Sequence, residues 1–211
     1  MKLKFKLSIP FIAINILAVA AILIAAYAVI SSSMLEYFRD SMKKKHAALV
    51  LEVESLVSRA QNSELWFSKS AELSSALAKS DKEALSGYCR SIGESFEFDF
   101  VTVLNPAGRV LASQGGGYQA GDDLSRKISV ITALSGELRT GIETDEKSGL
   151  VIVSAIPVKG PDGSLAGVAL AGFALNNLER LDDVKTMISA DVTIFGGDTR
   201  IATTIVRPDG S

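Results

Sequence analysis

The chain has 211 residues, of which 47% are hydrophobic and 22% charged, with 22 Lys and Arg against 24 Asp and Glu. This length accommodates one domain, or one and part of a second, plus a non-globular segment. The composition excludes a disordered chain and a basic nucleic-acid-binding protein. The single cysteine, Cys89, excludes an intramolecular disulfide framework, and the single histidine, His46, excludes sites that need two imidazoles. We therefore expect no enzyme, no catalytic residue, no metal site and no cofactor.

An uncharged apolar segment extends from Ile9 to Ile30, and as a helix it would reach roughly 33 Å at about 1.5 Å per residue, enough to cross a bilayer. Three preceding lysines and Ala26-Tyr27-Ala28 also fit a cleaved signal peptide, but the apolar run is longer than a signal-peptide core. We therefore expect a cytoplasmic tail (1–8), a transmembrane helix in the inner membrane (9–30) and a periplasmic remainder. Charge alone does not fix this orientation, because cations flank the segment on both sides.

A long extracytoplasmic helix is predicted over residues 31–80, continuing directly from the transmembrane helix. The segment from Ser31 to Lys79 has no Gly or Pro, and its apolar residues recur at spacings of three, four and seven. This stripe either pairs with the same helix of a second copy, giving a homodimer, or packs on the chain's own domain, and the sequence leaves both open. For Trp66 and Phe67, core or dimer packing is favoured over a place above a ligand pocket.

Residues 81–175 predict one α+β module with an antiparallel sheet. A helix is expected over Lys82–Ser95, and the Gly-rich loop from Gly115 to Gly121 leads into a short helix over 124–135. Turn sequences at Asn105–Gly108 and Lys159–Ser164 separate apolar and β-branched runs. These runs predict five strands, at 99–104, 109–113, 138–143, 150–158 and 165–174.

A weak internal repeat relates Val101–Ser113 to Val192–Thr204, at an offset of 91 residues and with three identities in thirteen positions. The shared order of strand, turn, arginine and strand predicts a second module that begins near Ala190. A strand pair is not a stable domain by itself. We therefore expect residues 176–211 to hold a linker helix and the start of a truncated second module, in a fragment of a longer protein.

Four segments, in their order along the chain, resemble a Cache sensory domain, which has a PAS-like five-stranded antiparallel sheet. They are Val101–Ser113, Gly121–Ser125, Val151–Val158 and Asp162–Leu170. Asp191–Thr204 resembles the start of the membrane-proximal module in double-Cache ectodomains of bacterial methyl-accepting chemotaxis receptors. The resemblance covers nearly the whole chain. It implies a chemoreceptor with a periplasmic ligand sensor, dimeric through its long helix. Cache ectodomains also occur on sensor histidine kinases and cyclic-dinucleotide synthases, and a membrane-tethered scaffold is the remaining alternative.

The resemblance implies a ligand pocket on one face of the sheet, under the loop and short helix between the second and third strands. The polar candidates for it are Tyr118, Arg126, Thr102 and Ser154. Arg126 can clamp a carboxylate and Tyr118 offers an aromatic wall with a hydroxyl, so a small molecule of the carboxylate class is the expected ligand. The Arg-x-Trp-Tyr pattern of the amino-acid-binding branch is absent around Trp66, so amino-acid sensing is not predicted. The net acidity of the exported part gives no reason to expect a nucleic-acid partner.

Overall fold

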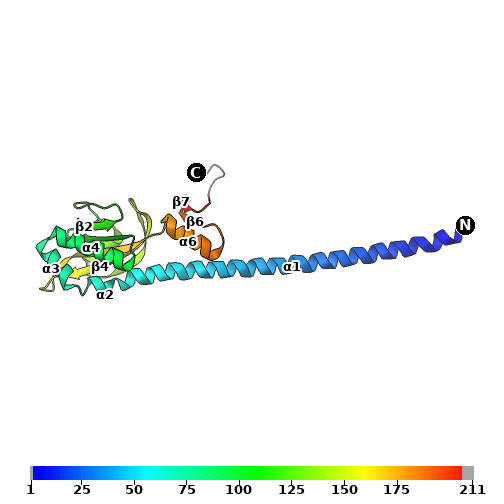
Figure 1. The fold of residues 1–211 in the computed structure, drawn as a ribbon, viewed down its shortest axis with the longest axis horizontal. Coiled ribbons are helices and arrows are strands. Elements are labelled where there is room, and N and C mark those ends of the chain that lie inside the picture. The colour runs from blue at the N-terminus through cyan, green and yellow to red at the C-terminus, as the bar shows by residue number, and fades with distance from the viewer. Residues whose placement is uncertain (1, 206–211) are drawn as a thin grey trace. The chain divides into compact units, whose positions relative to one another are not determined.

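The computed structural model describes residues 2–205, with side chains from Ile16 onward. The chain divides into two compact units, up to Ala48 and from Leu49. The first unit is the N-terminal part of helix α1 (Lys2–Asn62), drawn in blue in Figure 1. Its apolar side chains are exposed, including Leu17 at 69% and Ile24 at 70%. Within the described residues, α1 is the one helix long and apolar enough to cross a membrane.

The helix predicted over 31–80 is interrupted, which corrects that prediction. Helix α1 ends at Asn62, and the single turn α2 (Glu64–Phe67) and helix α3 (Ala71–Lys79) follow it. The buried Ser63 hydroxyl donates to the carbonyl oxygen of Ala60 at 2.6 Å, and the Ser70 hydroxyl accepts the backbone N–H of Leu73 at 3.1 Å. Serine side chains that bond to nearby backbone compete with helix continuation and favour caps. The chain therefore changes direction without glycine or proline.

The second unit contains the five-stranded sheet that the sequence predicts. Its strands are β1 (Phe100–Leu104), β2 (Val110–Gly115), β3 (Arg139–Asp145), β4 (Gly149–Lys159) and β5 (Leu165–Ala174). They follow the order β2-β1-β5-β4-β3, and every neighbouring pair is antiparallel. Helix α5 (Ile128–Leu134) begins four residues later than predicted, because Ser125 lies in a turn closed by the Asp123 carboxylate and Lys127 has extended backbone. The remaining predicted boundaries agree with those observed to within two residues. Helix α4 (Lys82–Phe96) precedes the sheet in the chain.

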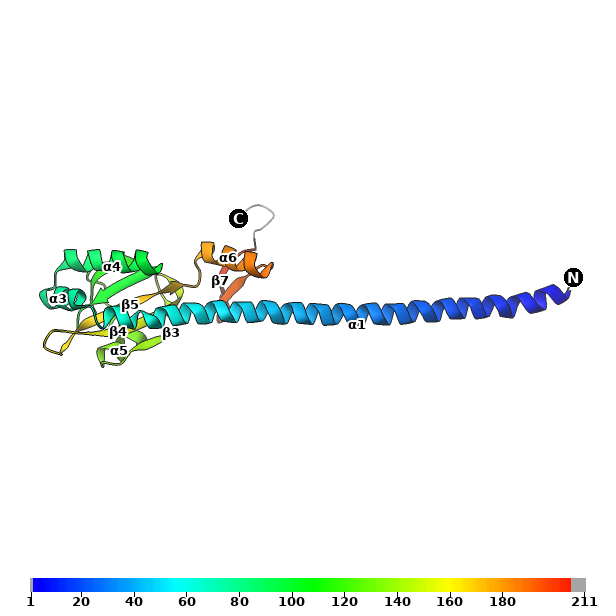
Figure 2. The same ribbon diagram turned by 60° about the horizontal axis from the view of Figure 1, so that its bottom comes forward.

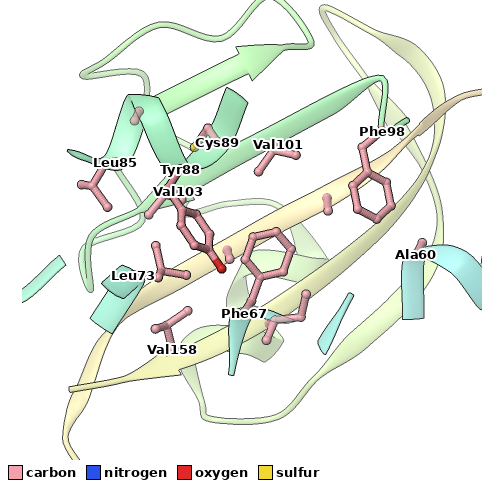
Figure 3. Packing of buried hydrophobic residues seen from close by; sticks show 14 of the residues in the cluster. Ala60, Phe67, Leu73, Leu85, Tyr88, Cys89, Phe98, Val101, Val103 and Val158 are labelled. Atoms are coloured by element: carbon pink, nitrogen blue, oxygen red, sulfur yellow. The ribbon is translucent and has the colours of Figure 1, made fainter. Parts of the chain in front are cut away.

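Each face of the sheet carries its own apolar cluster. Helices α3 and α4 cover one face and α5 covers the other, as Figure 2 shows. Phe67, Leu73 and Tyr88 belong to the first cluster and point toward the strands in Figure 3, where buried Cys89 also lies. Alternation along β4 assigns Ile152 to this cluster and Val153 to the second. The second cluster forms the floor beneath α5 and the Gly-rich loop.

The sheet is followed by helix α6 (Leu178–Ile188) and a strand pair, β6 (Thr193–Gly196) and β7 (Thr199–Thr203). This pair repeats features of β1 and β2, at an offset of 91 residues in the first strand and of 90 in the second, so the ungapped match predicted from sequence slips by one residue after the turn. The hydroxyls of Thr102 and Ser113 share a cross-strand hydrogen bond of 2.7 Å, and those of Thr193 and Thr203 share one of 2.8 Å. Both pairs also change register at the equivalent step, after Val103 and after Ile194. The internal repeat is therefore structural, although the second turn is shorter.

Candidate functional site

Three segments meet at the buried carboxylate of Asp145, at the end of β3. The Tyr118 hydroxyl, from the Gly-rich loop, donates to Asp145 Oδ2, and the Lys127 ammonium, from the start of α5, pairs with the same oxygen. The other oxygen, Oδ1, accepts the backbone N–H groups of Lys147 at 2.9 Å and Ser148 at 2.8 Å. The Asp145 side chain is 6% exposed. It therefore joins the loop, the helix start and the β3–β4 turn.

The Gly-rich loop reaches Asp145 because consecutive glycines adopt left-handed backbone. The backbone angle φ of Gly115, Gly116 and Gly117 is 69°, 63° and 70°. Residues that carry a Cβ rarely adopt such positive values. The β3–β4 turn then holds the loop: Lys147 Nζ donates to the carbonyl oxygen of Gly117 at 3.1 Å, and the Ser148 hydroxyl donates to that of Gly116 at 3.0 Å. These contacts fix the two residues that directly precede Tyr118.

A second carboxylate, that of Glu143 on β3, holds the start of α5. Its two oxygens accept the backbone N–H of Ser129 at 3.0 Å and the Ser129 hydroxyl at 2.9 Å. Arg139 Nε lies 3.7 Å from the same carboxylate. A carboxylate at a helix N-terminus satisfies unpaired backbone N–H groups and interacts favourably with the helix dipole. Glu143 therefore positions α5, and with it Lys127, against the sheet.

Hydrogen bonding determines the ionisation of Asp145. Burial by itself raises the pKa of this carboxyl, but the hydrogen bonds from Lys127, Tyr118 and the two backbone N–H groups outweigh burial and hold the pKa below its usual value. Burial and the hydrogen bond to Asp145 raise the pKa of Tyr118 well above its ordinary value. At neutral pH the Asp145 side chain is therefore a carboxylate, and that of Tyr118 is a neutral phenol that donates to it.

Two cavities adjoin this cluster, an outer cleft of about 360 Å³ and an inner cavity of about 10 Å³. Tyr118 and Lys127 line both, so these two side chains form the wall between them. The inner cavity has room for a single water molecule at most. The outer cleft is lined by Tyr118, Asp122, Asp123, Leu124, Arg126, Lys127, Thr144, Glu146 and Lys147.

The structure brings three of the four sequence-predicted residues to this region. Tyr118 and the exposed Arg126 line the outer cleft, and the fully buried Thr102 lines the inner cavity. Ser154 does not join them. Its neighbours Val151 and Val153 line the inner cavity, so by strand alternation Ser154 points to the opposite face, where its hydroxyl pairs with that of Thr140 at 2.9 Å.

Sequence reasoning did not identify Lys127, Glu143, Asp145 or Lys147 as site residues. Asp145 and Lys147 stand in a charged segment before Gly149, which by composition resembles a solvated turn. Lys127 follows Arg126 and has no distinguishing pattern of its own. In the part of the chain with described side chains, no group of three or more His, Cys, Asp or Glu residues is placed to hold a metal ion.

A sequence family described as the double sensory domain of two-component sensor kinases (dCache_3) matches residues 42–209. The chain belongs to this double-Cache family. The family's double sensory architecture agrees with the structural repeat of the β1–β2 pair in β6–β7. The predicted resemblance to a Cache sensory domain is confirmed. No curated protein matches the chain.

Solved structures support the same fold. The Vibrio cholerae histidine kinase DctB sensor domain has 12% identity and a TM-score of 0.60, covering 85% of this chain and 69% of its own. The Escherichia coli DcuS sensor domain has 16% identity and a TM-score of 0.52, and the match covers 63% of this chain and 96% of the DcuS domain. The sensory domain of the Campylobacter jejuni chemoreceptor Tlp3, solved with isoleucine bound, has 15% identity and a TM-score of 0.53. The match covers 82% of this chain and 71% of the Tlp3 domain.

These similarities establish the α+β Cache fold with its five-stranded antiparallel sheet. They include domains from both histidine kinases and a chemoreceptor. The comparisons therefore support extracytoplasmic sensing by a double-Cache domain and do not separate the two receptor classes.

Proposed function

We propose that this double-Cache chain is the periplasmic sensor of a membrane-anchored receptor and binds a small anion, of the carboxylate class, in the outer cleft. The observation that carries the proposal is the placement of Arg126 and Lys127 beside the Tyr118 ring in the wall of one cleft. The oxygens of Asp145 already accept four donors from the protein, and Asp122 Oδ2 accepts Lys147 Nζ at 2.5 Å and the backbone N–H of Gln119 at 3.0 Å. Among the cations of the cleft, Lys147 is engaged by Asp122 and Gly117, whereas Lys127 donates to one oxygen of Asp145 and Arg126 is exposed.

Arg126 and Lys127 supply the donors that a carboxylate needs. The guanidinium of Arg126 offers five N–H donors in a planar fork, which matches a carboxylate with two parallel hydrogen bonds. Lys127 uses its ammonium on a single oxygen of Asp145, so it retains donors for a ligand on the cleft side. The ring of Tyr118 adds an apolar wall. An anion with a small apolar body fits these groups.

Membrane anchoring follows from α1 in this proposal. The uncharged residues 9–30 would cross the inner membrane, with residues 1–8 in the cytoplasm and the sheet in the periplasm, as in the family to which the chain belongs. The exposure of the described apolar side chains in this segment supports lipid as their surroundings.

A homodimer is the second part of the proposal. The predicted apolar stripe divides into two portions, because Leu56 and Ala60 are buried in the chain's own first cluster. Leu35, Phe38 and Met42 instead stay exposed on α1, at 67%, 54% and 65%. Spacings of three and four residues place these three side chains on one helical stripe, which suits pairing with a second copy.

Two output classes fit this sensor. The chemoreceptor predicted from sequence is supported by the structural similarity to Tlp3. A sensor histidine kinase is favoured by the family description and by the similarity to DctB. A cyclic-dinucleotide synthase and a scaffold have no comparable support. The coding sequence that follows Ser211 would separate the classes: long methylatable heptad helices identify a chemoreceptor, and a kinase domain identifies a histidine kinase.

The ligand proposal is tested by thermal unfolding of the full chain in detergent micelles with a panel of small mono- and dicarboxylates. We expect at least one to raise the unfolding temperature of the wild type, and Arg126→Ala to weaken that binding at least tenfold. Arg90→Ala is the matched control, since Arg90 is an exposed arginine on α4, which packs on the opposite face of the sheet. Equal binding by the Arg126 and Arg90 variants would show that the anion does not bind in this cleft.

A further inference from the structure

We infer that Lys127 closes the buried carboxylate of Asp145 to a ligand's ammonium group. The Lys127 ammonium occupies this carboxylate, so a ligand cannot pair with Asp145 while Lys127 is in place. This assignment rests on the proposed function for the position of the ligand. The contact between Lys127 and Asp145 is tested below without any natural ligand.

The first support is the complete use of the Asp145 oxygens. An ionised carboxylate has about four positions that accept hydrogen bonds. In this structure two backbone N–H groups take Oδ1, and the Tyr118 hydroxyl and the Lys127 ammonium take Oδ2. An ammonium from outside therefore finds no free position on Asp145 while Lys127 is in place.

The second support is burial. The Lys127 side chain is 23% exposed and that of Asp145 is 6% exposed, so this pair is shielded from water far more than a surface ion pair. Among the described residues, Lys127 is the sole partner of Asp145 in a salt bridge. Removing the ammonium would leave a buried carboxylate without its counter-charge, which is strongly unfavourable.

Lys147 provides an internal comparison. Its ammonium also lies over the Tyr118 ring, 4.9 Å from the centroid against 5.5 Å for Lys127. However, Lys147 pairs with Asp122 on the cleft side, and its side chain is 41% exposed. Two lysines therefore flank one aromatic ring, but only Lys127 neutralises the buried carboxylate.

The third support is the position of Lys127 in the wall between the two cavities. The inner cavity and the outer cleft are both lined by this side chain. Truncation to alanine removes three carbons and the ammonium, which together have the size of n-propylammonium. The variant would therefore connect the cleft to Asp145 and leave a space that this cation fills.

The experiment is chemical rescue of Lys127→Ala in the full chain in detergent micelles, with n-propylammonium chloride as the probe and sodium chloride at equal concentration as the reference. We expect Lys127→Ala to unfold at a lower temperature than the wild type. Millimolar n-propylammonium should raise the unfolding temperature of the variant by several degrees and leave that of the wild type unchanged. Lys147→Ala is the matched control and should show no rescue, because its carboxylate partner, Asp122, is partly exposed.

If Lys127→Ala does not fold alone, refolding with and without the amine gives the same readout, with folded protein expected only in its presence. The double variant Lys127→Met/Asp145→Asn should fold and ignore n-propylammonium, because it lacks the buried carboxylate. Equal effects of the amine on the wild type, Lys127→Ala and Lys147→Ala, or no effect on Lys127→Ala, would overturn the assignment. If n-propylammonium rescues Lys127→Ala but no carboxylate binds the wild type, the proposed ligand is refuted and the role of Lys127 stands.

Discussion

Arg180 Nη2, on α6, donates to both carboxylate oxygens of Asp99, at 3.2 Å to Oδ1 and 3.0 Å to Oδ2. Asp99 directly precedes β1 and also accepts the backbone N–H of Ala174 at 2.8 Å and the side-chain amide of Asn177 at 3.0 Å. One carboxylate thus ties the start of the sheet to the end of β5 and to α6. The Arg180 guanidinium also lies over the Phe173 ring, 5.0 Å from its centroid. These contacts fix the start of α6 to the sheet.

Replacing Asp99 should release α6 while leaving the sheet folded. In Asp99→Asn, Arg180 loses its ion pair in a region where both side chains are about one-fifth exposed, and we expect a loss of about 1–3 kcal/mol in the free energy of unfolding. Hydrogen exchange should accelerate in α6 more than in β4 and β5. Asp191→Asn is the control, because its ion pair with Lys185 is largely exposed. Unchanged exchange in α6 would contradict this role of Asp99.

The lowered pKa of Asp145 predicts acid sensitivity. A carboxylate whose pKa is lower in the folded state stabilises the fold fully above its unfolded pKa, about 3.9, and loses that contribution as the pH falls through the folded value. We expect Asp145→Asn to be less stable than the wild type at pH 7 by about 2 kcal/mol or more, because Lys127 is left half-buried and unpaired.

The difference in the free energy of unfolding between the wild type and Asp145→Asn should become smaller as the pH is lowered from about 5 to 2. Urea denaturation followed by circular dichroism at several pH values measures it. Asp162→Asn is a useful comparison, because Asp162 also has a lowered pKa but is exposed in the β4–β5 turn and bonds only within that turn. A gap for Asp145→Asn that stays constant from pH 7 to 2 would rule out the ionised carboxylate as the source of its stabilisation.

The sequence predicts the sheet well, because apolar runs bounded by turn residues are local signals that specify strands, as in β5, whose predicted bounds are those observed. It predicts the candidate site less well, because the site forms between segments distant in sequence. Tyr118 meets Asp145 across 27 positions, and no local pattern indicates that the β3–β4 turn holds the Gly-rich loop. The face on which Ser154 lies is not predictable either, because a strand buried on both sides has no polar alternation to orient it.

The left-handed glycines before Tyr118 should be sensitive to a single methyl group. A Cβ on Gly116 would lie 2.9 Å from the Phe100 Cβ, at a φ of 63°. We expect Gly116→Ala to cost about 1–2 kcal/mol and to weaken carboxylate binding by moving Tyr118. Gly87→Ala, inside α4 where an added Cβ would meet no atom within 4 Å, should instead stabilise the protein by up to about 1 kcal/mol. Equal stability of the two variants, measured by urea denaturation, would exclude strain at Gly116.

Two adjacent aromatics, Trp66 and Phe67, should differ strongly in their contribution to stability. Phe67 is fully buried in the first cluster, with its ring 6.0 Å from that of Tyr88, so Phe67→Ala should cost about 3–5 kcal/mol. Trp66 is 52% exposed and packs on Phe96 at 5.0 Å, so Trp66→Ala should cost less than half as much. Circular dichroism during urea denaturation measures both, since Trp66 is the single tryptophan and its fluorescence is lost in one variant. A larger loss for Trp66→Ala than for Phe67→Ala would mean that Trp66 is buried in the protein's working state, as contact with a second copy would require.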